Sequence, residues 1–214
     1  MKLICKQKEP REWVEYRNTP GADYEAIPEL RRSLYMEQGG ICAYCMRRLS
    51  DEFDSERSTE NKVEHVRPRQ TCEDAQARME YTNLLMCCSG TISGTAYSQT
   101  HCDTHKGSRT ISFTPTDPEF IKTLYYNNYG KIFSTDPLFN EEINSVLNLN
   151  HPRLVENRKQ LIFSIITWLS NSKPSKGQIQ KHIEKYQSRD RNGFFTAYCE
   201  AAVWRLKKSL KGRL

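Results

Sequence analysis

The spacing of apolar residues near the start of the chain predicts one helix after an irregular segment. In residues 24–38, Ile27, Leu30 and Leu34 recur three or four positions apart among charged side chains, which is the period of a helix with one buried face. A glycine pair follows directly and would end that helix. Residues 1–20 show no such period, so we expect an irregular or strand-like lead-in there.

Two short apolar runs in the next part of the chain predict strands. Residues 62–66 alternate between polar and apolar side chains, and Pro68 ends the alternation. Residues 69–82 are polar, which favours a loop or a short helix, and residues 83–86 form the second apolar run. Because a helix is expected near Cys102, the predicted order is strand, strand, helix, a ββα arrangement.

Two polar stretches interrupt this arrangement. One continues as far as Asn61 from the cysteine-containing segment at residues 42–45, and the other extends from Ser89 to Thr100. Both are poor in apolar residues, and the second is rich in Ser, Thr and Gly. Such composition predicts turns and loops.

The remainder of the chain has a mainly helical pattern. A hairpin is expected over 120–133 and helical structure over 137–170, followed by two further helices. The apolar stripes of these two helices consist of Ile179, Ile183 and Tyr186, and of Phe195, Cys199, Ala202, Leu206 and Leu210. We interpret both stripes as core. The sequence thus predicts an α+β protein with one module over 1–116 and a mostly helical region over 117–214 that is suited to docking a partner or nucleic acid.

Composition is that of a globular chain and argues against a membrane protein. Hydrophobic residues make up 37% and charged residues 27%, which is enough for a core of ordinary size. The sequence contains no run of about 18 apolar residues, the length that a membrane-spanning helix needs. Charged residues occur too early near the N-terminus for a secretory signal. We therefore expect a cytoplasmic protein with no membrane partner.

The positive charge is concentrated at one end of the chain. The net charge is +6, and residues 181–214 hold nine Lys and Arg against three Asp and Glu, while the rest of the chain is balanced. A basic segment of this kind is typical of a surface that meets nucleic acid or an acidic partner. Charge alone indicates a solvated helix face equally well.

The cysteines predict a structural metal site. Five of the eight lie between residues 42 and 102, and without an export signal disulfides are not expected. Cys42 and Cys45 have the Cys-x-x-Cys spacing that presents two thiolates to Zn²⁺ from one turn. Cys102 and one of its two cysteine neighbours across the insertion would complete four ligands. We favour Cys88 over Cys87, because Cys88 lies five residues after Asn83 and its side chain would therefore extend past the end of the predicted strand.

Other interpretations of the same cysteines remain open. His101 is a substitute ligand, and a set of reduced, buried thiols would need no metal at all. The insertion of 13 residues between Cys88 and Cys102 also removes the simple spacing of a double Cys-x-x-Cys motif.

Between the two cysteine pairs lies a group of residues suited to phosphodiester hydrolysis. That reaction needs a base near a water molecule, a divalent cation at the phosphate and nearby positive charge. His65 is the candidate base, because imidazole titrates near neutral pH. Glu64 and Asp103 offer the hard oxygen ligands that Mg²⁺ or Mn²⁺ prefers. Asn83 is expected to hydrogen-bond across the loop and hold the strand that carries His65.

Four basic residues flank these groups and are the candidate contacts to the phosphates of a nucleic acid. Two follow the first strand and two lie on or after the predicted helix. They are Arg67, Arg69, Lys106 and Arg109.

Four sequence runs resemble the HNH endonuclease superfamily and, more narrowly, the PtuB-type HNH proteins of Septu and retron antiphage systems. These runs are Gln38-Gly-Gly-Ile-Cys-Ala-Tyr-Cys45, Val63-Glu-His-Val-Arg-Pro68, Asn83-Leu-Leu85 and Cys102-Asp-Thr-His-Lys-Gly107. Residues 126–132 and 143–150, with Leu154 and Arg158, are similar to the same subfamily. The resemblance covers most of the chain to about residue 160.

The resemblance implies a ββα-metal nuclease fold with His65 as general base and Asn83 as the orienting middle residue. The third HNH position is usually His or Asn. Here it is Asp103, with His105 two residues later, and the sequence leaves both open. The resemblance further implies a PtuA-like ATPase as partner, a retron reverse transcriptase with its msDNA through that complex, and a role in abortive antiphage defence.

Two alternatives concern what the chain acts on and whether it acts at all. DNA is the expected substrate by resemblance, and RNA, including tRNA, is the other candidate. The alternative to a nuclease is a catalytically inactive zinc-binding adaptor that docks nucleic acid or the ATPase. Such an adaptor would need the cysteines but not Glu64 and His65.

Overall fold

The computed structural model describes residues 1–51, 53, 61–91 and 96–212. Within them, the first half contains short elements around a two-stranded sheet. These are α1 (Arg11–Arg17), α2 (Pro28–Glu37), β1 (Asn61–His65), α3 (Ala75–Arg78), β2 (Leu84–Cys88) and α4 (Cys102–Lys106), with 3-10 turns at Arg69–Thr71, Tyr81–Asn83 and Tyr97–Gln99. Residues 52 and 54–60 of the first expected polar stretch and residues 92–95 of the second lie outside the described residues.

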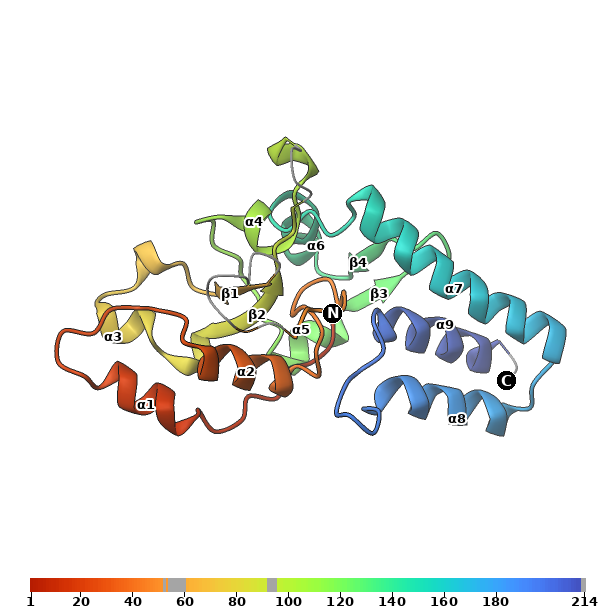
Figure 1. The fold of residues 1–214 in the computed structure, drawn as a ribbon. Coiled ribbons are helices and arrows are strands. Elements are labelled where there is room, and N and C mark those ends of the chain that lie inside the picture. Colours follow the sequence, from red (N-terminus) through yellow and green to blue (C-terminus); the bar gives the residue numbers. More distant parts are fainter. Residues whose placement is uncertain (52, 54–60, 92–95, 213–214) are drawn as a thin grey trace.

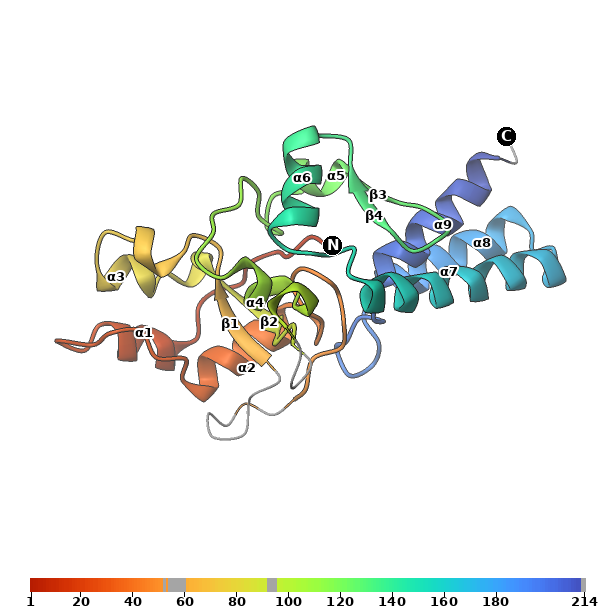
Figure 2. The ribbon, with the colours of Figure 1, turned by 90° about the horizontal axis from the view of Figure 1, so that it is seen from above.

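The second half is mostly helical and contains the second small sheet. Its elements are α5 (Pro118–Lys122), β3 (Leu124–Tyr126), β4 (Ile132–Ser134), α6 (Pro137–Ser145), α7 (Pro152–Ser172), α8 (Lys176–Gln187) and α9 (Cys199–Lys211). Figures 1 and 2 show the α7, α8 and α9 layer at one end of the molecule, α1 to α3 at the other, and the β1–β2 sheet between them. The α+β class is therefore confirmed.

The predicted strand, strand, helix order is present. β1 and β2 are antiparallel, with Asn61 opposite Cys88 and His65 opposite Leu84, and α4 packs against β2. β2 is buried along its whole length, whereas β1 alternates in part. β2 is therefore covered on both faces, and the end of β1 carries Glu64 and His65 to the edge of the core.

α2 is the expected first helix, but it begins later than the pattern indicated. Its first residue is Pro28, and proline disfavours helical backbone at the residue before it while suiting the first helical position. The helix ends before Gly39 and Gly40, whose φ angles of 63° and 68° lie in the left-handed region that glycine adopts without strain. The chain reverses there and enters the Cys42 turn.

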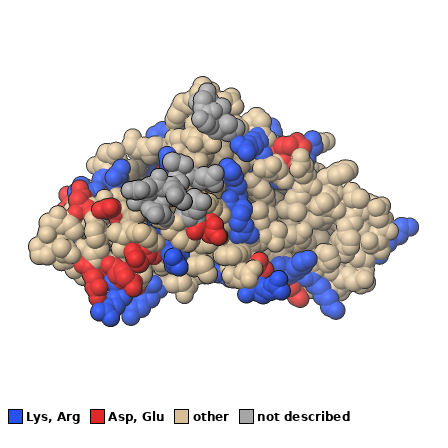
Figure 3. Space-filling view, in the orientation of Figure 1, with Lys and Arg blue, Asp and Glu red and all other residues tan. Residues whose placement is uncertain are grey.

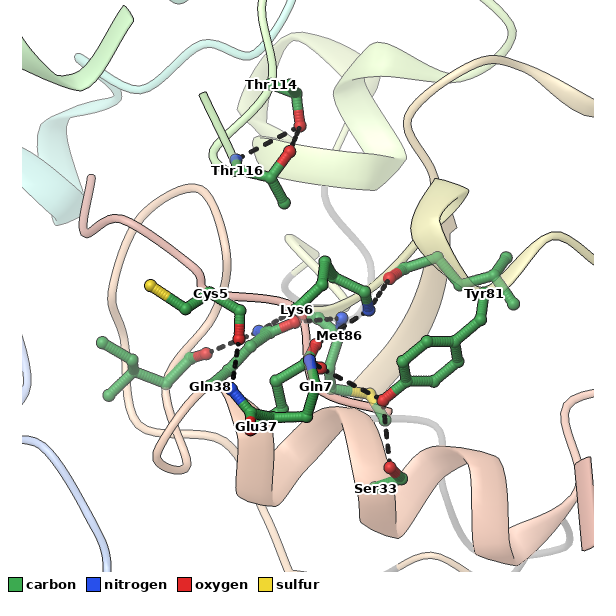
Figure 4. A network of polar contacts seen from close by, with 12 residues as sticks. Cys5, Lys6, Gln7, Ser33, Glu37, Gln38, Tyr81, Met86, Thr114 and Thr116 are labelled. Carbon is green, nitrogen blue, oxygen red and sulfur yellow. Dashed lines mark hydrogen bonds and ion pairs between the residues drawn. The ribbon is translucent and has the colours of Figure 1, made fainter. Parts of the chain in front are cut away.

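A polar network fixes the end of α2 to the sheet (Figure 4). The Gln38 amide donates to the carbonyls of Ile41 and Met86 at 3.0 and 2.8 Å, and its oxygen accepts from the Met86 amide at 2.7 Å. Beside it, buried Glu37 pairs with Lys6 Nζ at 2.8 Å. These bonds hold the cysteine turn against β2.

The lead-in over residues 1–20 was wrongly expected to lack helix. Residues 11–17 form α1, whose Trp13 is fully buried and donates from Nε1 to the Met79 carbonyl at 3.2 Å. The short helix has only one buried side chain, so its period could not be recognised from spacing.

Two expectations in the helical region also need correction. The helical run over 137–170 is two helices, because residues 146–151 form a turn in which Asn148 has a φ of 47° and Pro152 starts α7. Phe195 does not belong to the last helix, which begins at Cys199. The Phe195 amide instead donates to the Gly39 carbonyl at 3.0 Å.

The division at residue 116 is not marked by separate cores. One buried cluster extends from Met1 through the cysteines to Ile162 and Ala201, and a second lies between α7, α8 and α9. The expected boundary thus stays a prediction. No helix among the described residues has the length and apolar character needed to cross a bilayer.

Candidate metal site and catalytic cleft

Four cysteines from three separate segments meet in the interior. The Sγ atoms of Cys42, Cys45, Cys88 and Cys102 all lie within 4.8 Å of one another, and all four residues are buried. The closest pairs are Cys45 with Cys88 at 3.7 Å and Cys42 with Cys102 at 3.9 Å. This set could hold a metal ion, and four clustered thiolates match the donor set and tetrahedral geometry of structural Zn²⁺.

The local backbone explains why these side chains converge. Met46 and Cys102 both have positive φ angles, 63° and 56°, at the end of the Cys-x-x-Cys turn and the start of α4. The Arg47 amide donates to Cys45 Sγ at 3.4 Å, a contact that favours a thiolate. Thiol donors from Cys102 and Cys45 overcome burial and hold the pKa of Cys42 well below its ordinary value. Burial raises the pKa of Cys102 well above its ordinary value, and contacts with Cys42 and Cys45 do the same for Cys88. The cluster by itself thus favours an ionised sulfur at Cys42, and a bound metal would be needed to ionise Cys88 and Cys102.

The structure separates the two neighbouring cysteines of β2. Successive side chains of a strand point to opposite faces, and Cys88 is the one that joins the cluster. Cys87 is also fully buried but is not one of the four, and burial, together with its contact to Cys42, raises its pKa well above the ordinary value. His101 lies beside the cluster, with Nδ1 at 3.2 Å from Cys102 Sγ, so it neighbours a ligand rather than replacing one.

A cleft of about 790 Å³ opens on the outer side of β1 and α4. It brings together residues from the segment before α2, from β1, from the turn after β1 and from α4. Its polar lining includes Tyr24, Glu25, Arg31, Lys62, Glu64, His65, Arg69, Gln70, Asp103 and Thr104. Three of the five expected catalytic residues, Glu64, His65 and Asp103, thus share one cavity.

His65 is held in a defined orientation at the wall of this cleft. Its Nε2 lies 3.0 Å from the Arg78 carbonyl, and because a carbonyl only accepts, Nε2 carries the proton and Nδ1 keeps a lone pair. Tyr24 packs edge-on against the ring at 4.3 Å. Burial, together with the charges of Arg69 and Lys106, lowers the pKa of His65 to about 4. The imidazole is therefore neutral at physiological pH.

Glu64 is buried next to His65 and has two donors on one oxygen. Oε1 accepts from Lys106 Nζ at 2.8 Å and from the Tyr44 hydroxyl at 2.9 Å. Burial and the neighbouring Asp103 raise the pKa of Glu64 well above its ordinary value, and Lys106 opposes that shift. We assign an ionised Glu64, because the buried ammonium would otherwise have no counter-charge.

Asn83 makes the hydrogen bonds across the loop that its position predicted. Its Oδ1 accepts from the Arg67 amide at 2.7 Å, and its Nδ2 donates to the Arg67 carbonyl at 3.0 Å. The side chain thereby closes the turn two residues after His65 and fixes the end of β1.

Asp103 and His105, between which the resemblance left the choice open, point in different directions. Asp103 lines the cleft and lies 3.6 Å from Lys62 Nζ. His105 stacks on Tyr97 at 4.7 Å between ring centroids, and its Nδ1 is 3.1 Å from the Thr100 hydroxyl. Because α4 turns about 100° per residue, positions 103 and 105 lie on opposite sides of it.

The four basic residues that were expected to contact phosphate differ in how strongly their side chains are bonded within the protein. Arg69 lines the cleft, above the Tyr24 ring, while Arg67 is exposed at a separate small pocket. Lys106 is 1% exposed and bound to Glu64. The Arg109 guanidinium donates to the carbonyls of Ser145 and Val146 at 2.9 and 3.1 Å. Lys106 is thus too deeply buried to contact a phosphate in this structure, which corrects that expectation. Arg109 is exposed as well as bonded to backbone, and its contact with phosphate stays a prediction.

Three residues of the site were missed by the sequence analysis. Tyr44 sits inside the Cys-x-x-Cys turn and is fully buried on Glu64, which a buried-type aromatic between two ligands could have signalled. Tyr24 and Lys62 were treated as parts of a helix and a strand. Their place in the cleft depends on tertiary packing that no local pattern reveals.

The basic C-terminal segment is partly structural too. Arg189 donates to the carbonyls of Met36 and Glu37, both at 2.7 Å. In Figure 3 basic side chains gather along the lower edge over α8 and the segment before α9, and a second basic group lies beside the acidic side chains at the α1 end.

In comparisons with known proteins, no family model matches the chain, and neither does any curated protein.

Proposed function

We propose that this protein is a metal-dependent endonuclease of the HNH type that hydrolyses phosphodiester bonds of nucleic acid. One observation carries the proposal: His65 presents a neutral imidazole to a cleft that also contains Glu64 and Asp103, with its Nε2 bound to the Arg78 carbonyl. Such a fixed tautomer leaves Nδ1 to accept a proton from water.

In the proposed hydrolysis, each residue of the cleft has a separate role. His65 would take the proton of the attacking water, and Asn83 keeps the strand end that carries it in place. Glu64 and Asp103 would hold Mg²⁺ or Mn²⁺. Two carboxylates with water completing the coordination shell are a common arrangement for Mg²⁺. Such an ion supplies Lewis-acid stabilisation of charge on the phosphate. Arg69 and Lys62 on the cleft wall would contact neighbouring phosphates.

The four clustered cysteines would carry a separate, structural Zn²⁺. They connect the turn after α2, the end of β2 and the start of α4. Because β2 pairs with β1 and α4 carries Asp103, a metal there would fix the elements that form the cleft without taking part in the reaction.

The biological setting is proposed from the motifs alone. We propose DNA as the substrate, with RNA or tRNA as the alternative, since the same centre hydrolyses either backbone. The motifs also support a role as toxic effector of a retron- or Septu-type antiphage complex with a PtuA-like ATPase and, through it, a retron reverse transcriptase and its msDNA.

Cleavage of DNA and total RNA by the purified chain, with and without the ATPase, tests the activity. Wild type should cut one of them in the presence of Mg²⁺ or Mn²⁺, and His65→Ala should abolish cutting with folding and zinc content unchanged. His182→Ala is the matched control, because His182 stacks on Trp168 in the helical layer. Full activity of His65→Ala would exclude His65 as the base.

A second candidate is an inactive zinc-binding adaptor. It is favoured by the contact between Glu64 and buried Lys106, since a carboxylate already neutralised inside the protein has less need of an ion. An adaptor predicts zinc alone on metal analysis and no response to added Mg²⁺.

A further inference from the structure

Lys106 places an ammonium group behind the cleft, paired with Glu64. Its Nζ lies 2.8 Å from Glu64 Oε1 and donates to the His65 carbonyl at 3.0 Å, and the side chain is 1% exposed. Glu64 also accepts from Tyr44 at 2.9 Å. Among the described residues that line the cleft are Glu64 and Asp103, but neither Lys106 nor Tyr44. The ammonium thus lies on the inner side of a carboxylate whose outer side faces the cavity.

The charges around this carboxylate are unevenly compensated. Asp103 adds a second negative charge beside Glu64, and its nearest ammonium is Lys62 Nζ at 3.6 Å. The Lys62 side chain is 44% exposed, so solvent screens much of its effect. The buried Lys106 is screened far less. Among the described residues, Lys106 is the most deeply buried cation beside these two carboxylates, and it contacts Glu64 directly.

We propose that Lys106 is a resident counter-ion of the cleft, which keeps Glu64 and Asp103 in place without a divalent ion and limits how tightly such an ion binds. This inference rests on the proposed function, in which these carboxylates receive Mg²⁺ or Mn²⁺. Two cations that neutralise the same carboxylates oppose each other's binding, and this coupling is reciprocal. Removing the ammonium charge must then strengthen the binding of the ion and make the fold respond to it.

Manganese binding by Lys106→Gln measures this coupling directly. The variant removes the charge and keeps an amide donor for the His65 carbonyl. Zinc-loaded wild type and variant are titrated with Mn²⁺, with free Mn²⁺ followed by electron paramagnetic resonance and the unfolding temperature recorded in parallel. The variant should bind Mn²⁺ about tenfold more tightly or better, since loss of a buried charge is worth at least one such factor. Its unfolding temperature should rise with Mn²⁺ more than that of wild type.

Two further variants separate charge from shape. Lys106→Arg keeps the charge and should bind Mn²⁺ as wild type does or more weakly. Asp103→Asn removes one proposed ligand and should lose most of the binding, which locates the ion in the cleft. Equal or weaker Mn²⁺ affinity of Lys106→Gln than of wild type overturns the proposal, and so does the absence of saturable binding in both proteins.

A second neutral variant, Lys106→Met, covers a failure of the first to fold. Folding of either neutral variant only when Mn²⁺ is present supports the proposal, because the ion then replaces the missing charge. Failure of both to fold with or without Mn²⁺ overturns it, because Lys106 is then structural in a way that no ion can replace.

The measurement is independent of cleavage, so the two proposals can fail separately. A wild type that cuts nucleic acid while Lys106→Gln shows unchanged Mn²⁺ affinity removes this inference alone. A wild type that cuts nothing under any condition removes the proposed function, whereas the affinity ratio still reports whether Lys106 and the ion share the carboxylates.

Discussion

At the scale of single residues, three side chains at or behind the cleft are each held by a hydrogen bond to the backbone of another segment. His65 is oriented by the Arg78 carbonyl, Lys106 by the His65 carbonyl, and Asn83 by both backbone groups of Arg67. Such contacts fix direction as well as position, which catalytic groups require. The identities of His65, Glu64 and Asn83 could be proposed from the sequence, but their partners could not, since each partner lies in another segment.

The low pKa of His65 makes protein stability depend on pH. Burial is the main cause and sets the pKa near 4, against an ordinary value of 6.5. As the pH falls below about 6.5 the unfolded chain binds the proton first, so the stabilisation by neutral His65 is complete above that value and is lost toward and through pH 4. Wild type should therefore lose more unfolding free energy between about pH 7.5 and about pH 5 than His65→Gln does. Urea unfolding at both pH values checks this, and equal losses would contradict it.

The choice between Asp103 and His105 can be decided by two substitutions on the same helix. Asp103→Asn removes a charge that faces the cleft, so cleavage should fall about a hundredfold, the usual scale for losing one electrostatic contact in a catalytic site. His105→Ala acts on the opposite side of α4 and should leave the rate close to that of wild type. The reverse ranking in a cleavage assay would assign the third position to His105. The sequence could not decide this, because the start of α4 depends on the left-handed Cys102.

At the scale of elements, β2 sets which cysteine belongs to the cluster. The strand runs from Leu84 to Cys88 in register with β1, so alternation assigns its last two side chains to different faces. Alternation of polar and apolar residues predicted β1, and a short apolar run predicted β2, which is buried on both faces. Neither pattern revealed α1, whose single buried residue, Trp13, gives no period.

Serine substitutions of the two adjacent cysteines test this assignment. Cys88→Ser should lower the zinc content and the unfolding temperature sharply, because removal of one of four thiolates weakens a structural zinc site that contributes directly to folding. Cys87→Ser is the matched control: it is equally buried and should retain zinc. Elemental analysis and thermal unfolding give both readouts, and loss of zinc only from Cys87→Ser would reverse the assignment.

At the scale of the whole molecule, the helical region is joined to the cysteine turn by backbone contacts. The amides of Phe195 and Tyr198 donate to the carbonyls of Gly39 and Met46, both at 3.0 Å. The Arg48 guanidinium donates to the Phe195 carbonyl and also to the Gly40 carbonyl, the latter at 3.0 Å. The sequence predicted helices here but placed Phe195 on the last of them. Contacts between residues about 150 positions apart have no signature in local periodicity.

Gly39→Ala measures the strength of that junction. Gly39 has a φ of 63°, and a Cβ there would lie 2.5 Å from Phe195 Cδ2. The substitution should lower the free energy of unfolding by about 1–3 kcal/mol. Gly177→Ala, in α8 with only the Ser175 hydroxyl near the added atom at 4.0 Å, should be neutral or stabilising by up to about 1 kcal/mol. Urea unfolding curves of the two variants give the comparison, and equal effects would show that the junction is loose.

In the proposed function, zinc holds the scaffold while a second, exchangeable ion binds in the cleft. Zinc content and cleavage measured on the same sample, after brief EDTA treatment and again after Mg²⁺ is added, separate the two ions. EDTA should stop cleavage while about one zinc per chain is retained in the buried four-cysteine site, and Mg²⁺ alone should restore cleavage. Cleavage that persists without free divalent ions, or that returns only with zinc, would contradict these roles of the two ions.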